Sequence, residues 1–392
     1  MRIGFVGNTN NYPMMLAMAF RRLGHEVVFV IHRSEPLHRP EFRYPDVTHP
    51  YPDWLVEVPA PGAADFVTDR GVRDRTLEAL RGCDLVVLND TAIALAGRLS
   101  APYFVMLTGS DLSYYANPAG AARAMSGVTT RNPLKRLWAR TVWHRLLSAQ
   151  RAAIRNAPLV YVFARGLIPE NDALLDGIGV RDDQRIFFLM ADVDRLKCGP
   201  PPDRDRLRGF CATRLTWKGP PLPGDCPLDF KGSDVMVRGL GRYVRDGGRI
   251  ALQLVRKGRH VEETVRLAEA EGLATSVTWH DEMTQADVWR EYRLADVVYE
   301  QFGEGLVSMA GLEAMASGRP VVANGRPDLM RQLFGVDFPV CHATDAVGVC
   351  EQTRRLEDAG HRAEVGRRSR EWVEANCDPV VIAGRVLSRL GM

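Results

Sequence analysis

Residues 295–324 read ADVVYEQFGEGLVSMAGLEAMASGRPVVAN, and this stretch decides the fold that we expect for the chain. A short apolar run opens it and a loop with two glycines follows. A run of Ala, Leu, Met and Glu then favours a helix, which Gly318 and Pro320 end. The pattern predicts a βαβ unit made of strand Ala295–Tyr299, loop Gln301–Ser308, helix Met309–Ser317 and strand Val321–Ala323. In open α/β sheets, ligands bind at the carboxyl ends of such strands.

Glu313 lies one turn inside the expected helix. The first backbone N–H groups of a helix are free to bind an anion. A carboxylate one turn further in can accept hydrogen bonds from a sugar diol beside that anion. The alternative is that Glu313 is an ordinary solvated helix residue, and the residues alone leave both interpretations open.

The run LEAMASGRPVV at residues 312–322 resembles the donor-site motif of retaining GT-B glycosyltransferases of the family 4 type, EAMAxGxPVV. The resemblance extends to KGSD at residues 231–234 and, more loosely, over nearly the whole chain. It implies the α/β GT-B fold, in which two Rossmann-like domains face each other across an interdomain cleft. It also implies that Glu313 holds the ribose hydroxyls of a nucleoside diphosphate sugar.

The chain departs from the family pattern at the contact with the transferred sugar. The family often has a glutamate eight positions before the ribose glutamate, and here that donor-site position is Gly305. Two acidic candidates remain for the sugar contact, the adjacent Glu304 and the more distant Glu300, which precedes a glutamine. The resemblance also implies that the loop 280–283 borders the nucleobase, and we assign Met283 to the donor site.

Two cations are expected at the donor diphosphate. Arg214 follows an expected strand over 210–213, and Lys231 precedes Gly-Ser-Asp at the start of an expected helix. The resemblance implies that both grip the diphosphate, where they would stabilise the charge that develops on the leaving group. Lys218 is an alternative to Lys231, but Gly-Pro-Pro follows it, so we prefer Lys231. With two cations and no D-x-D pair, we expect neither a metal nor a cofactor.

The chain begins with a similar pattern. An apolar strand, Arg2–Val6, leads through Gly7 and a polar loop into a helix over 13–23 and a strand over 25–31. This opening is typical of a doubly wound sheet, but it lacks G-x-G-x-x-G, which argues against an NAD-dependent enzyme. The resemblance places the loop near the donor phosphates or the acceptor. We therefore assign Gly7 to the donor site and Asn11 to the acceptor site, with a plain strand-to-helix turn as the alternative.

Polar residues end the next two expected strands, 84–88 and 102–107. Asn89, Asp90 and Thr108 are predicted to contact the acceptor, and Asp111 is predicted to bind a hydroxyl group as a catalytic residue. The resemblance adds that Thr108 stands where the family often has a histidine. For Asp111 the alternative is a cap on the following helix.

Length and composition predict two globular domains. A chain of 392 residues, 46% hydrophobic and 25% charged, is too long for one ordinary core. We expect an N-terminal acceptor domain over 1–195 and a C-terminal donor domain over 196–377, joined by a proline-rich linker. The resemblance implies that a last helix, 378–392, packs back on the first domain. Residues 32–80 are rich in proline, with only 73–80 helical in appearance, and are a candidate acceptor loop.

Other classes of protein are disfavoured. The seven cysteines show no C-x-x-C pair, which indicates a reduced protein without a disulfide scaffold or zinc site. No apolar stretch approaches the length of a membrane span. We expect a soluble, cytoplasmic protein, at most membrane-associated, and the abundance of Arg, Ala and Gly suggests a GC-rich bacterial source.

The stretch from Leu112 to Pro169 holds no acidic residue, in a chain with 48 Asp and Glu. Its basic segment, 123–165, predicts a peripheral membrane or another anionic partner, such as a phosphorylated carrier or an acidic substrate. An ordinary solvated helix is the alternative. No nucleic-acid motif accompanies the charge, so nucleic acid is not expected as a partner.

The expected function is retaining transfer of a hexose-type sugar from a UDP- or GDP-sugar to a hydroxyl acceptor. That acceptor is either a cell-surface glycolipid or polysaccharide precursor, or a small natural product. The rival hypotheses are a GT-B nucleotide-sugar epimerase or hydrolase, and a nucleotide-sugar-binding protein without catalysis.

Overall fold

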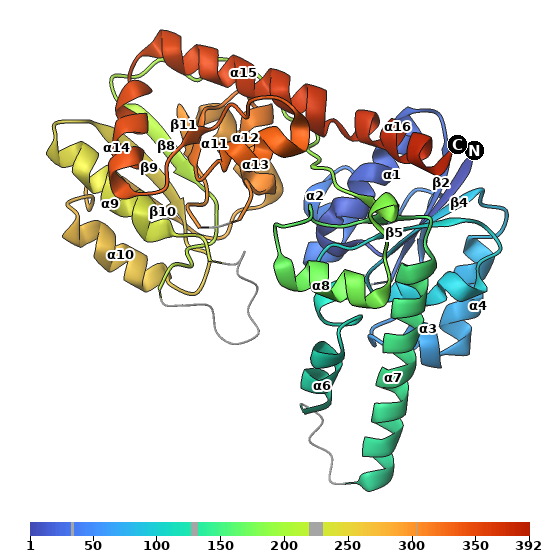
Figure 1. The fold of residues 1–392 in the computed structure, drawn as a ribbon. Coiled ribbons are helices and arrows are strands. Elements are labelled where there is room, and N and C mark those ends of the chain that lie inside the picture. Colours follow the sequence, from blue (N-terminus) through green and yellow to red (C-terminus); the bar gives the residue numbers. More distant parts are fainter. Residues whose placement is uncertain (33–34, 127–131, 219–229, 304) are drawn as a thin grey trace. The chain divides into compact units, whose positions relative to one another are not determined.

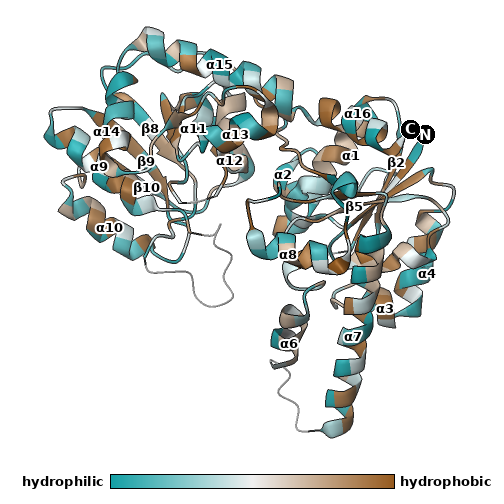
Figure 2. Cartoon of the chain, viewed as in Figure 1, coloured by the Kyte–Doolittle hydropathy of each residue, from teal (hydrophilic) through white to brown (hydrophobic). Residues whose placement is uncertain are grey.

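The computed structural model describes residues 1–392 except 33–34, 127–131, 219–229 and 304. The chain divides into two compact units. Unit 1 comprises Met1–Phe188 and Pro379–Met392, and unit 2 comprises Leu189–Asp378. Each unit is built on a parallel sheet with helices packed around it (Figure 1). The strands and the inner sides of the helices carry most of the apolar residues, as Figure 2 shows.

The sheet of unit 1 has seven strands among the described residues, in the order β3-β2-β1-β4-β5-β6-β7, and the strands pair in parallel. The central strands are continuous apolar runs because helices cover both faces of a parallel sheet. Val6 lies opposite both Val30 and Leu88, so three strands end together. The strands are β1 (Arg2–Val6), β2 (Glu26–Ile31), β3 (Leu55–Glu57), β4 (Leu85–Asn89), β5 (Tyr103–Met106), β6 (Leu159–Tyr161) and β7 (Arg185–Ile186).

Helices connect these strands, as parallel pairing requires. Local signals set several of their ends: the Asp69 carboxylate caps α4, and the Asn132 side chain caps α7 with Oδ1 2.9 Å from the Leu134 nitrogen. The α-helices are α1 (Tyr12–Arg22), α2 (Pro40–Arg43), α3 (Asp65–Thr68), α4 (Arg70–Ala79), α5 (Ser110–Ser113), α6 (Pro118–Ser126), α7 (Pro133–Asn156), α8 (Pro169–Ile178) and α16 (Pro379–Leu390). The 3₁₀ turns are η1 (Thr9–Asn11), η2 (Pro36–His38), η3 (Asp90–Arg98) and η4 (Asp182–Gln184).

Residues 32–80 are more regular than their sequence indicates. Besides the expected helix they contain α2, α3 and the edge strand β3, in which Leu55 pairs with Phe29. The expectation of a single helix here was therefore wrong. A three-residue strand between prolines has no local pattern of its own, and the exposed edge of β2 supplies the pairing that makes it a strand.

The sheet of unit 2 has six strands among the described residues, in the parallel order β10-β9-β8-β11-β12-β13. The quoted motif forms β11, α12 and β12, as expected. The last edge strand starts at Cys341, which lies opposite Val322. The strands are β8 (Leu207–Cys211), β9 (Ile250–Val255), β10 (Val277–His280), β11 (Val297–Tyr299), β12 (Val321–Ala323) and β13 (Cys341–His342).

The helices of unit 2 follow the same alternation. Gly239 lets α9 and α14 approach closely, since a Cβ there would lie 2.5 Å from the Val349 Cβ atom. The helices are α9 (Ser233–Arg245), α10 (Val261–Ala270), α11 (Gln285–Leu294), α12 (Met309–Ala316), α13 (Pro327–Phe334), α14 (Ala346–Arg355) and α15 (Ala359–Cys377). Within the described ranges, no helix of either unit has the length and apolarity needed to cross a membrane.

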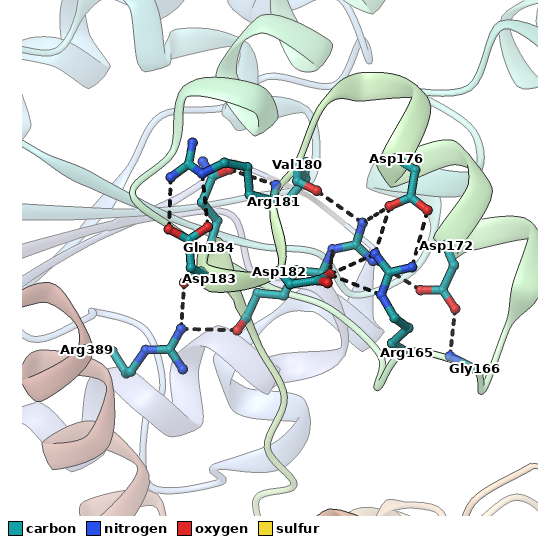
Figure 3. Close-up of polar contacts among 11 residues, drawn as sticks. Arg165, Gly166, Asp172, Asp176, Val180, Arg181, Asp182, Asp183, Gln184 and Arg389 are labelled. Carbon is teal, nitrogen blue, oxygen red and sulfur yellow. Dashed lines mark hydrogen bonds and ion pairs between the residues drawn. The ribbon is translucent and has the colours of Figure 1, made fainter.

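The last helix, α16, belongs to unit 1 and packs on α1. Ile382, Ala383 and Val386 are fully buried there. At its end, Arg389 donates to the Asp183 carbonyl at 2.7 Å, beside the ion pairs of α8 and β7 (Figure 3). The carboxyl-terminal residues therefore complete the core that the first strand begins.

Candidate functional site

The site of unit 2 lies where its strands end. β8 leads into Thr213 and Arg214, and β11 leads into Glu300 and Gln301. These two strands are neighbours in the sheet, so both pairs of residues come to one edge. The helices α9 and α12 begin at the same edge, because each follows one of these strands in the chain.

Lys231 is hydrogen-bonded to the loop after β11 through its side chain and its backbone. Its Nζ atom lies 3.0 Å from Gln301 Oε1, and its carbonyl oxygen accepts from the Phe302 nitrogen at 2.7 Å. The next residue, Gly232, has φ +63°, and a Cβ there would lie 3.1 Å from Phe302 and Gly303. The Lys-Gly pair thus places one cation at the amino end of α9, against the loop that leads to α12.

Arg214 stands on the other side of the α9 start. Thr213 before it is buried, whereas Arg214 is exposed, and the Arg214 carbonyl accepts from the Ser233 hydroxyl at 3.5 Å. The backbone of Arg214 and the side chain of Lys231 therefore both lie at the start of α9. Lys218 is also exposed, and its backbone nitrogen donates to His260 Nδ1 at 3.2 Å, on the side of α10.

Glu300 is hydrogen-bonded to residues at the far end of the loop between β11 and α12 and at the end of β8. Its side chain is buried, with Oε1 accepting from the Ser308 hydroxyl at 2.6 Å and from the Thr213 hydroxyl at 3.3 Å. Ser308 is the residue at which α12 begins, so Glu300 joins the ends of β8 and β11 to that helix. Its two hydroxyl partners direct the carboxylate into the loop.

Gly305 packs on Gln301. A Cβ at this position would lie 2.8 Å from the Gln301 Nε2 atom, so a larger residue would displace the amide that contacts Lys231. The adjacent Glu304, the other acidic candidate, lies outside the described residues.

Glu313 is buried in the middle of α12. Gln285, the first residue of α11, donates from Nε2 to Glu313 Oε2 at 3.0 Å. Met283 lies two residues before that glutamine and is half-buried. Gln285 therefore joins Glu313 to the start of α11, which the loop that contains Met283 precedes.

In unit 1, Asn89 is hydrogen-bonded to Thr108 and Asp111, two other residues that were predicted to bind the acceptor or a hydroxyl group. Its Nδ2 group lies 2.9 Å from Thr108 Oγ1 and 3.1 Å from Asp111 Oδ2, and its Oδ1 atom accepts from the Thr9 nitrogen at 2.9 Å. Gly7 makes this approach feasible: its φ is +97°, and a Cβ there would lie 2.4 Å from the Asn89 carbonyl oxygen. Gly7 therefore has a structural reason to be glycine.

The Asp111 side chain is hydrogen-bonded to the backbone of the turn in which it lies. The buried carboxylate accepts from the backbone nitrogens of Thr108, Gly109 and Leu112 at 2.9 to 3.0 Å. Burial raises its pKa to about 6, and the nearby Asp90 carboxylate acts in the same direction, while the backbone donors oppose the shift. Asp111 lies inside α5, which has no side-chain cap, so its carboxylate is not a helix cap and instead positions Thr108 and Gly109.

Asn11 also serves the chain itself. It is buried with φ +58°, and its amide nitrogen donates to the carbonyls of Leu37 and Arg39 at 3.1 and 2.9 Å. The Asn8 amide donates to Asn11 Oδ1 at 2.7 Å. These asparagines fix the loop after β1 to the start of the proline-rich segment, as a structural strand-to-helix turn would.

A buried His32–Asp90 pair was missed in the sequence. His32 follows β2 directly, and its Nε2 atom lies 3.4 Å from Asp90 Oδ2, with both side chains buried. Asp90 has φ +59°, and its carbonyl accepts from Gln150 at 3.0 Å. His32 could have been found by the signal that indicated Asn89 and Thr108, because it is a polar residue at the carboxyl end of an apolar strand. Among the residues that the structure describes, no group of three His, Cys, Asp or Glu could hold a metal ion.

Comparisons with known proteins agree with this architecture. Residues 224–357, which include α9 to α14, match the family model described as glycosyl transferases group 1. A comparison with curated protein sequences finds no match for this chain.

Solved structures resemble the whole chain. Sucrose-phosphate synthase from Thermosynechococcus elongatus has a TM-score of 0.60 at 15% identity, and covers 100% of this chain and 99% of its own. HepE from Anabaena, solved with UDP and glucose, has a TM-score of 0.60 at 14% identity, with coverage of 100% and 99%.

A putative UDP-N-acetylglucosamine 2-epimerase from Listeria monocytogenes is also similar, with a TM-score of 0.53, 13% identity and coverage of 100% and 95%. At these identities the likeness concerns the fold. The chain has the GT-B fold, and the family match together with these neighbours supports a GT-B glycosyltransferase.

Proposed function

We propose that this protein is a retaining glycosyltransferase that moves a hexose-type sugar from a nucleoside diphosphate sugar to a hydroxyl acceptor. One observation carries the proposal: Lys231 and Arg214 flank the start of α9, with Lys231 Nζ 3.0 Å from the Gln301 side chain. This arrangement offers two cations and a helix amino terminus to one anionic group, which suits a diphosphate.

The cations would assist departure of the nucleoside diphosphate. Negative charge grows on the leaving phosphate as the bond to the sugar breaks, and fixed cations stabilise that charge most when it is fully developed. In a retaining reaction, the departing phosphate oxygen takes the proton of the acceptor hydroxyl on the same face of the sugar. The two cations do the electrostatic work of a metal ion, so we propose that transfer is metal-independent.

Glu313 is proposed to bind the ribose hydroxyls, with Gln285 holding its carboxylate in place at 3.0 Å. Met283 would lie beside the nucleobase. Glu300 has its oxygens directed to Ser308 and Thr213, so we propose that it shapes the sugar pocket, while Glu304 remains the acidic candidate for direct contact. UDP and glucose are bound by the HepE neighbour, which favours a UDP-hexose donor here.

On unit 1, Thr108 and the His32–Asp90 pair are proposed to meet the acceptor. These side chains stand at the carboxyl ends of β5, β2 and β4, where ligands bind in open sheets. Asn89 and Asp111 hold Thr108 in position. The acceptor is a hydroxyl compound, either a cell-surface glycolipid or polysaccharide precursor, or a small natural product.

Thermal shift with UDP-, GDP-, ADP- and TDP-sugars tests the donor site, with wild type beside Glu313→Gln. A ligand at about 100 times its Kd should stabilise the fold by roughly 2.7 kcal/mol. We expect one nucleotide series to raise the Tm of the wild type, and Glu313→Gln to remove the shift. The control is Glu351→Gln on the exposed side of α14, which should keep the shift. No shift with any sugar nucleotide would rule out the proposed donor site.

A nucleotide-sugar epimerase is the second candidate, because the Listeria neighbour shares the fold. Product analysis separates the two. Transfer predicts a new glycoside in the presence of an acceptor, whereas an epimerase changes the donor sugar with no acceptor present.

A further inference from the structure

The largest exposed apolar side chains of unit 1 gather on one turn of α7. Leu134, Leu137 and Trp138 are 75%, 62% and 64% exposed, whereas no other exposed large hydrophobic residue of the described chain exceeds 47%. Scattered surface leucines are ordinary, but three adjacent side chains this exposed mark a surface that another body covers.

These residues lie on the part of α7 that extends away from the core. The carboxyl-terminal half of the helix is anchored by Val142, Leu146 and Ile154, which are buried, whereas residues 133–138 are all exposed. Figure 1 shows this end of α7 extending beyond the sheet of unit 1, and Figure 2 shows apolar and hydrophilic residues interleaved along it. At 1.5 Å per residue, the exposed end, residues 133–138, is about 9 Å long.

Basic residues border the apolar turn. With 100° per residue, Leu137, Leu134 and Trp138 form one stripe. Lys135 lies about 60° beyond one side of that stripe and Arg140 about 60° beyond the other. Arg136 and Arg145 are exposed nearby. An apolar stripe with cations on both sides is the pattern of a helix that lies in the plane of an anionic lipid surface.

No described residue of the chain forms an ion pair with the cations that border this end of α7. Arg165, at the far end of the acid-free stretch, pairs with Asp176 and Asp182 at 2.8 and 2.7 Å (Figure 3). Among the described residues, Lys135, Arg140 and Arg145 have no such ion pair, and no acidic residue occurs between Leu112 and Pro169. The bordering cations are therefore available to anionic headgroups.

We propose that the exposed end of α7, with Leu134, Leu137 and Trp138 bordered by Lys135 and Arg140, docks unit 1 on an anionic membrane surface. The two leucines and the tryptophan enter the boundary between headgroups and acyl chains, where an indole is favourable. The basic residues contact the lipid phosphates. This docking does not depend on the proposed transferase activity, and failure of either leaves the other standing.

Vesicle sedimentation of the full chain tests the proposal. The probes are phosphatidylcholine vesicles with and without phosphatidylglycerol, at low and high salt. We expect binding to the anionic vesicles alone, weakened by salt. The triple variant Leu134→Ser, Leu137→Ser, Trp138→Ser should abolish it. Lys135→Glu with Arg140→Glu should weaken it by about fivefold or more for each residue changed.

Two controls make the result specific. Val347→Ser with Arg266→Glu removes an exposed apolar residue and an exposed cation from unit 2 and should leave vesicle binding unchanged. Because the three apolar side chains are exposed, the triple variant should keep the wild-type Tm, which excludes misfolding as the cause of lost binding.

Three outcomes would overturn the proposal. They are no binding to anionic vesicles, equal binding of wild type and triple variant, and a concentration-dependent dimer that the triple variant abolishes while vesicles remain unbound. In the last case a second copy of the chain covers the surface.

Discussion

At the scale of single residues, Lys231 illustrates how a motif cation is positioned. Its backbone carbonyl and its side chain both bind the loop after β11, so the ammonium group is held where the loop and α9 meet. Lys218 also precedes a glycine, but its described contact is to His260 and not to the loop after β11. The difference arises from the contacts of β11, which lies far from either lysine in the sequence.

Replacing Lys231 by alanine should therefore lower kcat by about 10² to 10³, because the lost charge acts mainly in the transition state. KM for the nucleotide sugar should change much less. Steady-state kinetics with the matched Lys218→Ala variant provide the comparison, and that control should retain kcat. A larger loss in Lys218→Ala would reverse the assignment of the two lysines.

Asp111 predicts a pH dependence of stability. Burial raises its pKa to about 6, from an ordinary value near 3.8, so the native state binds the proton more tightly than the unfolded state does. The stability that this proton contributes is complete below pH 3.8 and is lost as the pH rises through about 6. The shift corresponds to about 3 kcal/mol.

The measurement is urea unfolding of wild type and Asp111→Asn between pH 4 and 7. As the pH rises, the unfolding free energy of the wild type should fall relative to that of Asp111→Asn, because the amide of the variant does not titrate. A pH-independent difference would contradict the raised pKa.

At the scale of elements, the carboxyl ends of β1 and β4 meet too closely for a side chain. Gly7 has φ +97° and faces the Asn89 carbonyl, so Gly7→Ala combines backbone strain with a steric clash. We expect a loss of about 2–4 kcal/mol in the unfolding free energy. In Gly97→Ala the new methyl group meets no atom within 4 Å, so that control should stay within about 1 kcal/mol of wild type. Thermal or urea unfolding checks both, and an unaffected Gly7→Ala would show that the two strand ends can separate.

At the scale of the whole molecule, the chain leaves unit 1 once and returns to it. Unit 2 is one continuous segment, Leu189–Asp378, whereas unit 1 needs α16 to cover α1. The core of unit 1 is therefore complete only when the last residues of the chain have been added.

Truncation after Asp378 should destabilise unit 1 by about 3–6 kcal/mol, since it removes the fully buried Ile382 and Val386. Amide hydrogen exchange should show lost protection in α1 and unchanged protection in α9. Removing only Gly391 and Met392, which are exposed, is the control. Equal loss of protection in both units would indicate that they unfold as one.

The amino-acid sequence determined the features that depend on neighbouring residues. Continuous apolar runs predicted β1, β2 and β4, and the small-residue helix with its Gly and Pro stops predicted α12. The resemblance of the same stretch to a family motif implied the GT-B fold, which is confirmed. These signals are local. A run of consecutive apolar residues indicates a strand that is buried on both faces, and a glycine or proline directly after a helix indicates its end. The stretch without acidic residues that contains α7 is likewise visible in the sequence.

Which strand ends meet cannot be read from neighbouring residues and becomes visible in the folded chain. The pairing of His32 with Asp90 and the hydrogen bonds of Asn89 to Thr108 and Asp111 depend on such contacts. The strand β3 likewise exists because β2 offers it an edge. Sheet order is set by non-local pairing, so polar residues with the same local sequence signal became a buried His–Asp pair or an exposed cation according to the partner that the sheet brought to them.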